Sequence, residues 1–181
     1  MLEYYEDLGY YYINGFGNEL NGNMSCKFAK DIKETFEKGN IKGSFYFSHS
    51  EALLPFQSLL GLYKDDFKLT HDMYATEEIT HRKYLTSLIG PFAQNIGFVF
   101  FQCEDAKNKI LALHQEKIVH LDRCGETECD WEQFKESFQV CFLSPTLQRI
   151  MEINHVSILF IFILEHTIFG LFAGRNKMSL G

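Results

Sequence analysis

Hydrophobic residues recur every three or four positions in several segments of the chain, which is the spacing of one face of an α-helix. The pattern predicts helices over residues 2–12, 26–38, 52–60 and 131–139, and partial helix over 74–88. The expected apolar face of the first helix comprises Leu2, Tyr5, Leu8 and Tyr12. That of the second comprises Phe28, Ile32 and Phe36, with Ser25 as an N-terminal cap. The Gly- and Asn-rich stretch 14–23 between these helices predicts a loop.

Short apolar runs with aromatic and β-branched residues predict strands over 44–47, 96–102 and 109–114. The polar residues 104–108 separate the last two runs, so these strands are expected to form an antiparallel hairpin. Further on, Asp130 precedes the helix expected over 131–139, and Gln133 stands where a capping box places its second residue.

The last part of the chain has a different pattern. Residues 156–173 are almost wholly apolar, but Glu165 and His166 interrupt the run near its middle. A bilayer span needs about 20 apolar residues, and a central charge is costly there. Two interpretations stay open: a marginal membrane helix, or a tail that is not part of the domain. A lipid-anchor signal is disfavoured because the chain continues into Arg175 and Lys177.

Composition fits one domain with a sizeable core, since 46% of the 181 residues are hydrophobic and 15% are aromatic. The formal net charge of −7 argues against a nucleic-acid partner, which would require a basic face. The same charge disfavours a polyanionic substrate, unless a positive pocket is local or comes from residues outside this chain.

The chain has five cysteines, which are Cys26, Cys103, Cys124, Cys129 and Cys141. The spacing of Cys124 and Cys129 is not that of a zinc ribbon and favours a short-loop disulfide in a secreted protein. Reduced, buried cysteines in a cytosolic domain are the alternative. Asn23 begins a glycosylation sequon, which agrees with secretion. Because Met1 opens directly into a polar helix without an apolar signal sequence, we expect the true N-terminus to lie further upstream.

His49 and Glu51 lie where the strand predicted over 44–47 meets the helix predicted over 52–60. Backbone amides at a helix N-terminus favour anions, and the carboxyl ends of strands in α/β sheets are where ligands bind. A histidine at the strand end and a carboxyl group in the first helical turn can converge on one anion. Taken alone, such a pair is more often a surface contact than a catalytic dyad.

The stretch from Phe47 to Pro55, Phe-Ser-His-Ser-Glu-Ala-Leu-Leu-Pro, resembles the His-Ala-Glu box of multiple inositol polyphosphate phosphatases, a family of histidine acid phosphatases. The run from Leu59 to Asp65 is similar to that family's continuation of the box. The resemblance extends in order over residues 1–141, as the C-terminal portion of the phosphatase domain. Residues 142–181, which include the apolar segment 156–173, form a tail that the resemblance does not cover.

The resemblance implies an α/β fold, with a mixed sheet flanked by helices and a smaller helical domain. It implies Glu51 as the proton donor, His49 as a contact to the phosphoryl group, and a closing disulfide region at Cys124, Cys129 and Cys141. The implied substrates are inositol polyphosphates or other phosphate esters, 2,3-bisphosphoglycerate among them, without cofactor or metal. The implied location of the complete protein is the secretory pathway.

The chain departs from the family pattern at two places. The box contains Ser50 where the family has alanine, a small change that we expect to be tolerated. The family's Arg-His-Gly-x-Arg-x-Pro motif, which supplies the nucleophilic histidine and phosphate-binding arginines, does not occur in these 181 residues. We therefore expect no activity from this chain alone.

Three interpretations follow: a part of an inositol polyphosphate phosphatase, a short non-catalytic module that binds phosphate or a partner, or a membrane-anchored structural protein. A part of the phosphatase on its own would leave a sheet edge and apolar helix faces exposed, which predicts poor solubility. The remaining histidines are expected to be surface or structural, without metal-ligand spacing; they are His71, His81, His114, His120, His155 and His166. Arg82 and Lys83 either face a polyphosphate or belong to a solvated helix face.

Overall fold

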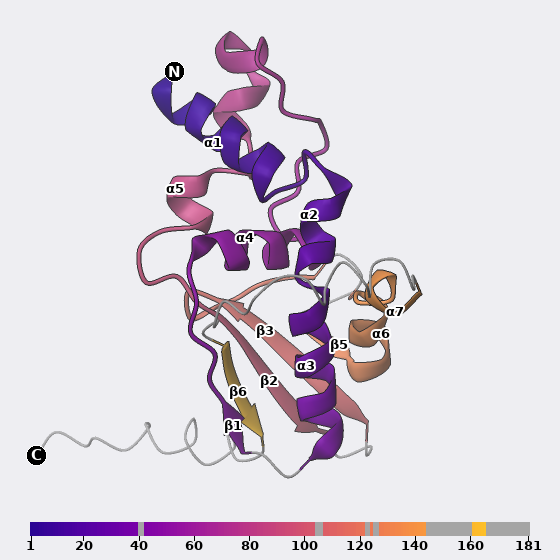
Figure 1. The fold of residues 1–181 in the computed structure, drawn as a ribbon. Helices are drawn as coiled ribbons and strands as arrows, with labels where there is room; N and C mark the ends of the chain where they lie inside the picture. Colours follow the sequence, from indigo (N-terminus) through magenta and orange to yellow (C-terminus); the bar gives the residue numbers. More distant parts are fainter. Residues whose placement is uncertain (40–41, 104–106, 122–123, 125–126, 144–160, 166–181) are drawn as a thin grey trace, which may run out of the picture.

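The computed structural model describes residues 1–39, 42–103, 107–121, 124, 127–143 and 161–165, which form one sheet and several helices (Figure 1). The helices are α1 (Leu2–Ile13), α2 (Glu19–Met24), α3 (Cys26–Lys38), α4 (Ser50–Leu59), α5 (Thr86–Ile89), α6 (Trp131–Glu136) and α7 (Val140–Leu143), with the 3-10 turns η1 (Met73–Ala75) and η2 (Glu78–His81). The strands are β1 (Gly43–Ser44), β2 (Ile96–Gln102), β3 (Asn108–His114), β4 (Lys117–Ile118), β5 (Glu128–Asp130) and β6 (Ile161–Glu165).

The sheet has the order β1-β6-β2-β3-β4, and β5 pairs with β3. The hairpin predicted from the apolar runs is confirmed, because β2 and β3 pair antiparallel from Ile96 opposite His114 to Gln102 opposite Asn108. Strand β6 runs parallel to β2 and antiparallel to β1. The fold is therefore α/β with a mixed sheet, as predicted.

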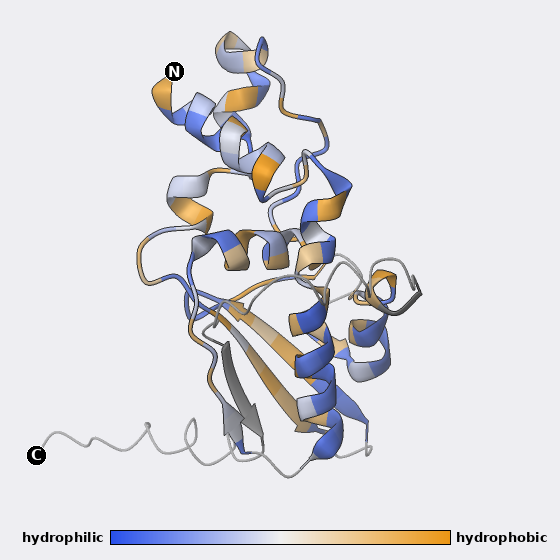
Figure 2. Cartoon of the chain, viewed as in Figure 1, coloured by the Kyte–Doolittle hydropathy of each residue, from blue (hydrophilic) through white to orange (hydrophobic). Residues whose placement is uncertain are grey.

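The main core lies between the sheet and helix α3, which crosses it in Figure 1. Strands β2 and β3 are strongly hydrophobic, whereas the outer turns of α3 are hydrophilic (Figure 2). The predicted stripe on α3 is confirmed, since Ile32 and Phe36 are buried and Phe28 packs against the core. The helix ends at Gly39, whose φ of 61° lies in the left-handed region that glycine adopts without strain.

A second, smaller core lies at one end of the sheet, where α1, α5 and the 3-10 turns gather (Figure 1). Helix α4 belongs to both cores. Its residues Leu53 and Phe56 pack into the sheet core, whereas Leu54 packs into the helical one. Two-sided burial of this kind fixes the position of α4, and with it the His49–Glu51 segment at its start.

The predicted buried face of α1 is wrong, although the helix itself is confirmed. The buried residues are Tyr4, Asp7 and Tyr11, whereas Leu2 is 84% exposed. The reason is that α1 packs through polar groups: the hydroxyl group of Tyr4 donates a hydrogen bond to the Thr70 carbonyl. A pattern of apolar spacing does not detect such a face.

Three smaller predictions also need correction. The stretch 14–23 is not a loop throughout, because helix α2 starts within it and the Asn18 side chain caps its first turn by accepting from Leu20 N at 3.0 Å. The strand expected over 44–47 is reduced to β1, and Phe45 and Phe47 are about half exposed. Ser25 and Asp130 occupy the cap positions of α3 and α6, but neither makes a side-chain capping hydrogen bond.

Two disulfides cross-link the fold. The short-loop disulfide between Cys124 and Cys129 is confirmed. Cys141 pairs with Cys26, a partner that the sequence left open, and this bond ties α7 to the first residue of α3. Cys103 is a free, half-buried cysteine.

Of the apolar segment 156–173, the structure describes only Ile161–Glu165; the other residues lie outside the described part of the chain. The described residues form strand β6, so the membrane-helix interpretation is wrong for these five positions, where the backbone pairs with β2 and β1. Across the described ranges, no helix has both the length and the apolar character needed to cross a bilayer.

The disulfide between Cys26 and Cys141 is expected to stabilise the fold far more than the one between Cys124 and Cys129. They close loops with sequence separations of 115 and 5 residues, for which the chain-entropy model gives about 5 and about 2 kcal/mol respectively. Urea denaturation of the double variants Cys26→Ala/Cys141→Ala and Cys124→Ala/Cys129→Ala measures both. Equal losses in the free energy of unfolding would contradict this ordering.

Candidate active site

His49, Ser50 and Glu51 form the N-terminal end of helix α4. His49 is the N-cap residue with extended backbone angles, φ −133° and ψ 172°. Its Nδ1 lies 2.7 Å from Glu51 Oε2, and the hydroxyl group of Ser50 donates to the same carboxylate oxygen at 3.2 Å. The structure therefore brings the two predicted site residues into direct contact, while their catalytic roles stay predictions.

A hollow of about 400 Å³ opens beside this pair. One wall is the start of α4 with the two residues before it, and the other is the segment that joins α5 to β2. The lining residues are Ser48, His49, Ser50, Leu53, Gly90, Pro91, Phe92, Ala93 and Gln94. Phe92 is fully exposed at the rim, and Ala93 has a φ of 61°, which a non-glycine residue seldom adopts.

Pro55 explains how the start of α4 is linked to α1. Proline has no N–H group, so it cannot donate to the carbonyl four residues earlier, which here belongs to Glu51. The buried side chain of Asn14, the C-cap residue of α1, donates to that carbonyl oxygen at 3.3 Å instead. An unpartnered backbone acceptor is thereby satisfied by a residue from a distant part of the sequence.

The surroundings of Glu51 favour its ionised form. Its own backbone N–H, and next the His49 side chain, lower the pKa of the Glu51 carboxyl group below its usual value. A carboxylate of this kind is a poor proton donor until another negative charge approaches it. A phosphate group in the hollow would supply that charge and raise the pKa of Glu51.

Neither interpretation of Arg82 from the sequence is correct. Its side chain is 8% exposed and forms an ion pair with Asp7, which is fully buried. The backbone N–H and the hydroxyl group of Thr86 donate to the other carboxylate oxygen of Asp7, at 2.8 and 2.6 Å. Arg82 is the only arginine among the described residues, and it binds α1 to the segment before α5 rather than facing a ligand.

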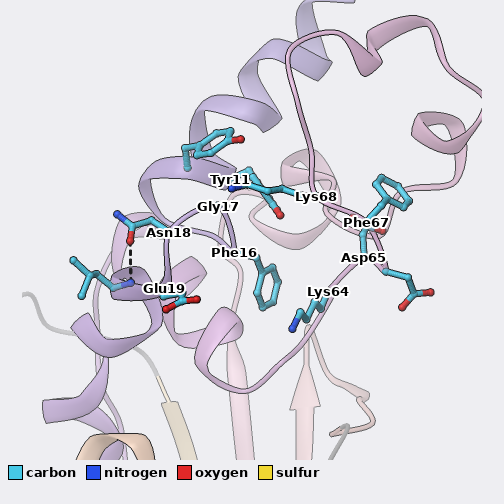
Figure 3. Close-up of a pocket in the computed structure, with 12 residues that line it drawn as sticks. Tyr11, Phe16, Gly17, Asn18, Glu19, Lys64, Asp65, Phe67 and Lys68 are labelled. Atoms are coloured by element: carbon cyan, nitrogen blue, oxygen red, sulfur yellow. Dashed lines mark hydrogen bonds between the residues drawn. The ribbon is translucent and has the colours of Figure 1, made fainter. Parts of the chain in front are cut away.

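A larger hollow of about 750 Å³ lies elsewhere, between α1, the start of α2 and residues 64–68 (Figure 3). Its lining includes neither His49 nor Glu51. Lys64 Nζ lies 5.8 Å from the centre of the Phe16 ring, and the acidic residues Glu19 and Asp66 are also in the lining. We place the candidate chemistry at the smaller hollow because His49 belongs to its lining and Glu51 contacts His49.

Among the other histidines, His114 is buried and structural, whereas His71, His81 and His120 are exposed. His155 and His166 lie outside the described residues. Within the described ranges, no three His, Cys, Asp or Glu side chains are grouped as metal ligands. Asn23 is half-buried in the last turn of α2, and its glycosylation stays a prediction.

Sequence reasoning missed Asn14 and the loop residues 90–94 as parts of this site. Asn14 had a usable signal, because Pro55 inside a helix leaves an acceptor that some donor must satisfy. Residues 90–94 had no such signal in the sequence, since their position opposite His49 depends on how α5 packs.

The hydrogen bond from Asn14 to the Glu51 carbonyl can be tested with a double-mutant cycle. Asn14→Ala removes the donor and is expected to cost about 1 kcal/mol in the free energy of unfolding. In a Pro55→Ala background the restored backbone N–H satisfies the carbonyl, so the same substitution should cost less. Denaturant melts of the four proteins give the coupling, and a coupling of zero would mean that Asn14 does not satisfy this acceptor.

The titration of Glu51 provides a second test. In the intact chain its carboxyl group should titrate below the ordinary value for glutamate, because the backbone N–H and His49 stabilise the carboxylate. His49→Ala should raise this pKa part of the way, whereas Ser50→Ala should have a smaller effect because its hydrogen bond is longer. Carboxyl carbon NMR shifts followed against pH measure all three, and a pKa unchanged by His49→Ala would show that the two side chains do not interact in solution.

Comparison with known proteins identifies the family of the chain. The family model of the "Histidine phosphatase superfamily (branch 2)" matches residues 1–117, which include the His49–Glu51 pair and both walls of the hollow. No solved structure gives a significant match.

Three proteins named multiple inositol polyphosphate phosphatase 1 are similar to the chain. That of Dictyostelium discoideum is 45% identical over 95 residues, which cover 51% of this chain and 15% of the relative. That of Drosophila melanogaster is 33% identical over 143 residues, 77% of this chain and 30% of the relative. The human protein is 32% identical over 154 residues, 77% of this chain and 31% of the relative. The chain thus spans less than a third of the length of these relatives.

The match to the family model covers most of the described fold and includes the predicted site. The predicted resemblance to the histidine phosphatases is therefore confirmed, and the chain belongs to branch 2 of the histidine phosphatase superfamily.

Proposed function

We propose that this chain supplies the proton-donating half of the active site of a phosphatase that acts on inositol polyphosphates. Glu51 protonates the alkoxide that leaves as the phosphate ester bond breaks. His49 hydrogen-bonds the phosphoryl group. The observation that carries the proposal is the contact between His49 and Glu51 at the start of α4, beside a hollow and within the part of the chain that matches the family.

The reaction needs a second half that these residues do not contain. In the mechanism implied by the family, a histidine attacks phosphorus and a phosphohistidine forms while the alcohol departs. Arginines neutralise the charge on the equatorial oxygens. The present sequence has no Arg-His-Gly motif, and Arg82 is engaged with Asp7. The chain alone is therefore proposed to bind phosphate weakly and to release no product.

The proposed substrate class rests on the names of the relatives. Among the described residues that line the hollow, none is a lysine or an arginine. The many charges of an inositol polyphosphate would have to be met by cations from the rest of the protein. 2,3-Bisphosphoglycerate is a second proposed substrate, since it offers the same phosphate ester to the same acid.

The proposed location of the complete protein is the secretory pathway. Two disulfides support it, because such bonds form and persist in oxidising compartments and are rare in the cytosol.

The role of Glu51 as an acid predicts a dependence on the leaving group. Sequencing the transcript upstream of the Met1 codon should reveal an in-frame Arg-His-Gly-x-Arg-x-Pro motif, and the complete protein can then be expressed. Glu51→Gln should lower the rate on inositol hexakisphosphate about 10²- to 10⁴-fold, because an alkoxide needs protonation to leave. The loss on p-nitrophenyl phosphate should be much smaller, since nitrophenolate leaves without a proton.

The exposed Glu132 on α6 provides the control, and Glu132→Gln should leave both rates unchanged. Equal losses on both substrates in Glu51→Gln would exclude the role as an acid. An in-frame stop codon close upstream would overturn the catalytic proposal and would favour a short phosphate-binding protein.

A further inference from the structure

A buried hydrogen-bonded cluster lies directly behind the hollow. His114, at the end of β3, is 4% exposed, and Gln57, on α4, is 2% exposed. The Gln57 amide nitrogen lies 3.0 Å from His114 Nε2 and donates to the Ile89 carbonyl at 2.8 Å. On the other side of the imidazole, the Tyr63 hydroxyl oxygen lies 2.5 Å from Nδ1.

These contacts determine the state of the imidazole. A carbonyl oxygen only accepts, so the amide nitrogen of Gln57, and not its oxygen, must face Ile89. The same nitrogen faces His114 Nε2, which must therefore accept a hydrogen bond. His114 is consequently neutral, with its proton on Nδ1 and directed at the Tyr63 oxygen.

Burial is the main reason why the pKa of His114 is lowered from its usual value; the Ile89 carbonyl and the charge of Glu116 oppose this shift. The side chains in contact with the ring are Gln57 from α4 and Tyr63 from the segment after α4. In the sheet, His114 pairs with Ile96 of β2 and Lys117 of β4. Tyr63 is itself half-buried, and burial raises the pKa of its hydroxyl group. It therefore brings no negative charge to favour an imidazolium.

The Gln57–Ile89 hydrogen bond joins the two walls of the candidate site. Gln57 is on the helix that begins at His49 and Glu51, and Ile89 directly precedes the lining residues 90–94. Packing at Gly90 adds to this link, because a Cβ atom there would lie 3.4 Å from Leu54 Cδ2 of α4 and 3.3 Å from the Thr86 carbonyl. The opposite wall is thus held against α4 by the Gln57–Ile89 hydrogen bond, by a longer hydrogen bond from the Gln57 amide nitrogen to Gln94 Oε1 at 3.5 Å, and by the close approach at Gly90.

We propose that His114 is a positioning residue: its neutral imidazole holds the Gln57 amide in the orientation that ties residues 89–94 to helix α4, and protonation of His114 releases this wall. A protonated Nε2 would face the amide hydrogens of Gln57. Either the amide turns and presents its oxygen to the Ile89 carbonyl, or the two side chains separate. Turning of the amide removes the Gln57–Ile89 hydrogen bond, and so does a separation in which Gln57 is the side chain that moves.

The consequence for catalysis rests on the proposed function. At a pH low enough to protonate His114, the residues opposite His49 and Glu51 would no longer be held in place. The hollow would then lose its shape through a change that begins outside its lining. A fall in pH would thus change the site indirectly, through protonation of a buried residue in the core.

The test is an NMR titration of the isotope-labelled 181-residue chain. The imidazole signals of His114, the side-chain amide signals of Gln57 and the backbone amide signals of residues 89, 90 and 92–94 are followed as pH falls. We expect the Gln57 signals and the backbone amide signals to shift with the same midpoint pH as the imidazole signals of His114. The variant His114→Gln, whose side-chain oxygen can accept from Gln57 but does not titrate, should lose this shift. His81→Gln, which replaces an exposed histidine, should retain it.

A second variant keeps the test decisive if His114→Gln does not fold. Gln57→Met retains the volume of the side chain but removes the tie, so the signals of residues 89–94 should already have their low-pH positions at neutral pH. The proposal is overturned if these signals do not follow the titration of His114. It is also overturned if they shift with pH in His114→Gln or in Gln57→Met as they do in the unchanged chain. Adding inorganic phosphate and observing the His49 signals tests the proposed function separately: absence of a response there would count against phosphate binding and leave the coupling through His114 untouched.

Discussion

The burial of helix α4 on two opposite sides is the constraint on which the arrangement of this fold depends. Leu53 and Phe56 enter the core under the sheet, and Leu54 enters the smaller helical core. Each fully buried side chain of this size contributes about 1.5–3 kcal/mol relative to an exposed one. Both cores include side chains of this helix, so the two halves of the molecule meet along it. The candidate site therefore lies at the junction of two packing units rather than at the edge of one.

The parts of the fold that depend on local spacing could be predicted from the sequence, and those that depend on polar contacts over long range could not. Helix α3 and the β2–β3 hairpin follow from their apolar periodicity. The buried face of α1 does not, because Asp7 is buried by its ion pair with Arg82, far along the chain. The His49–Glu51 pair was found from its motif. Gln94 and Asn14 reach the site only through packing and hydrogen bonding between distant segments.

The distribution of charge indicates which part of the proposed site the described residues supply. The described residues contribute a histidine and a carboxylate at the start of a helix, and the lining of the hollow carries no permanent cation. The lowered pKa of Glu51 shows that its surroundings already stabilise one negative charge. An incoming phosphate would compete with that carboxylate for the His49 side chain. Such competition favours transfer of a proton to Glu51 as the anion enters, which is the state that an acid needs before the ester bond breaks.

The disulfide between Cys26 and Cys141 makes most of the described fold a covalent ring. Helix α4, the hollow and the β2–β3 hairpin all lie between these two cysteines in the sequence. A protease that cuts one peptide bond within this stretch would open the ring but would not divide the molecule. The segments on either side of the nick would remain joined through sulfur, and the core could hold them in register. A nicked chain in an oxidising compartment can therefore outlast the cleavage that would separate the same elements in a reducing one.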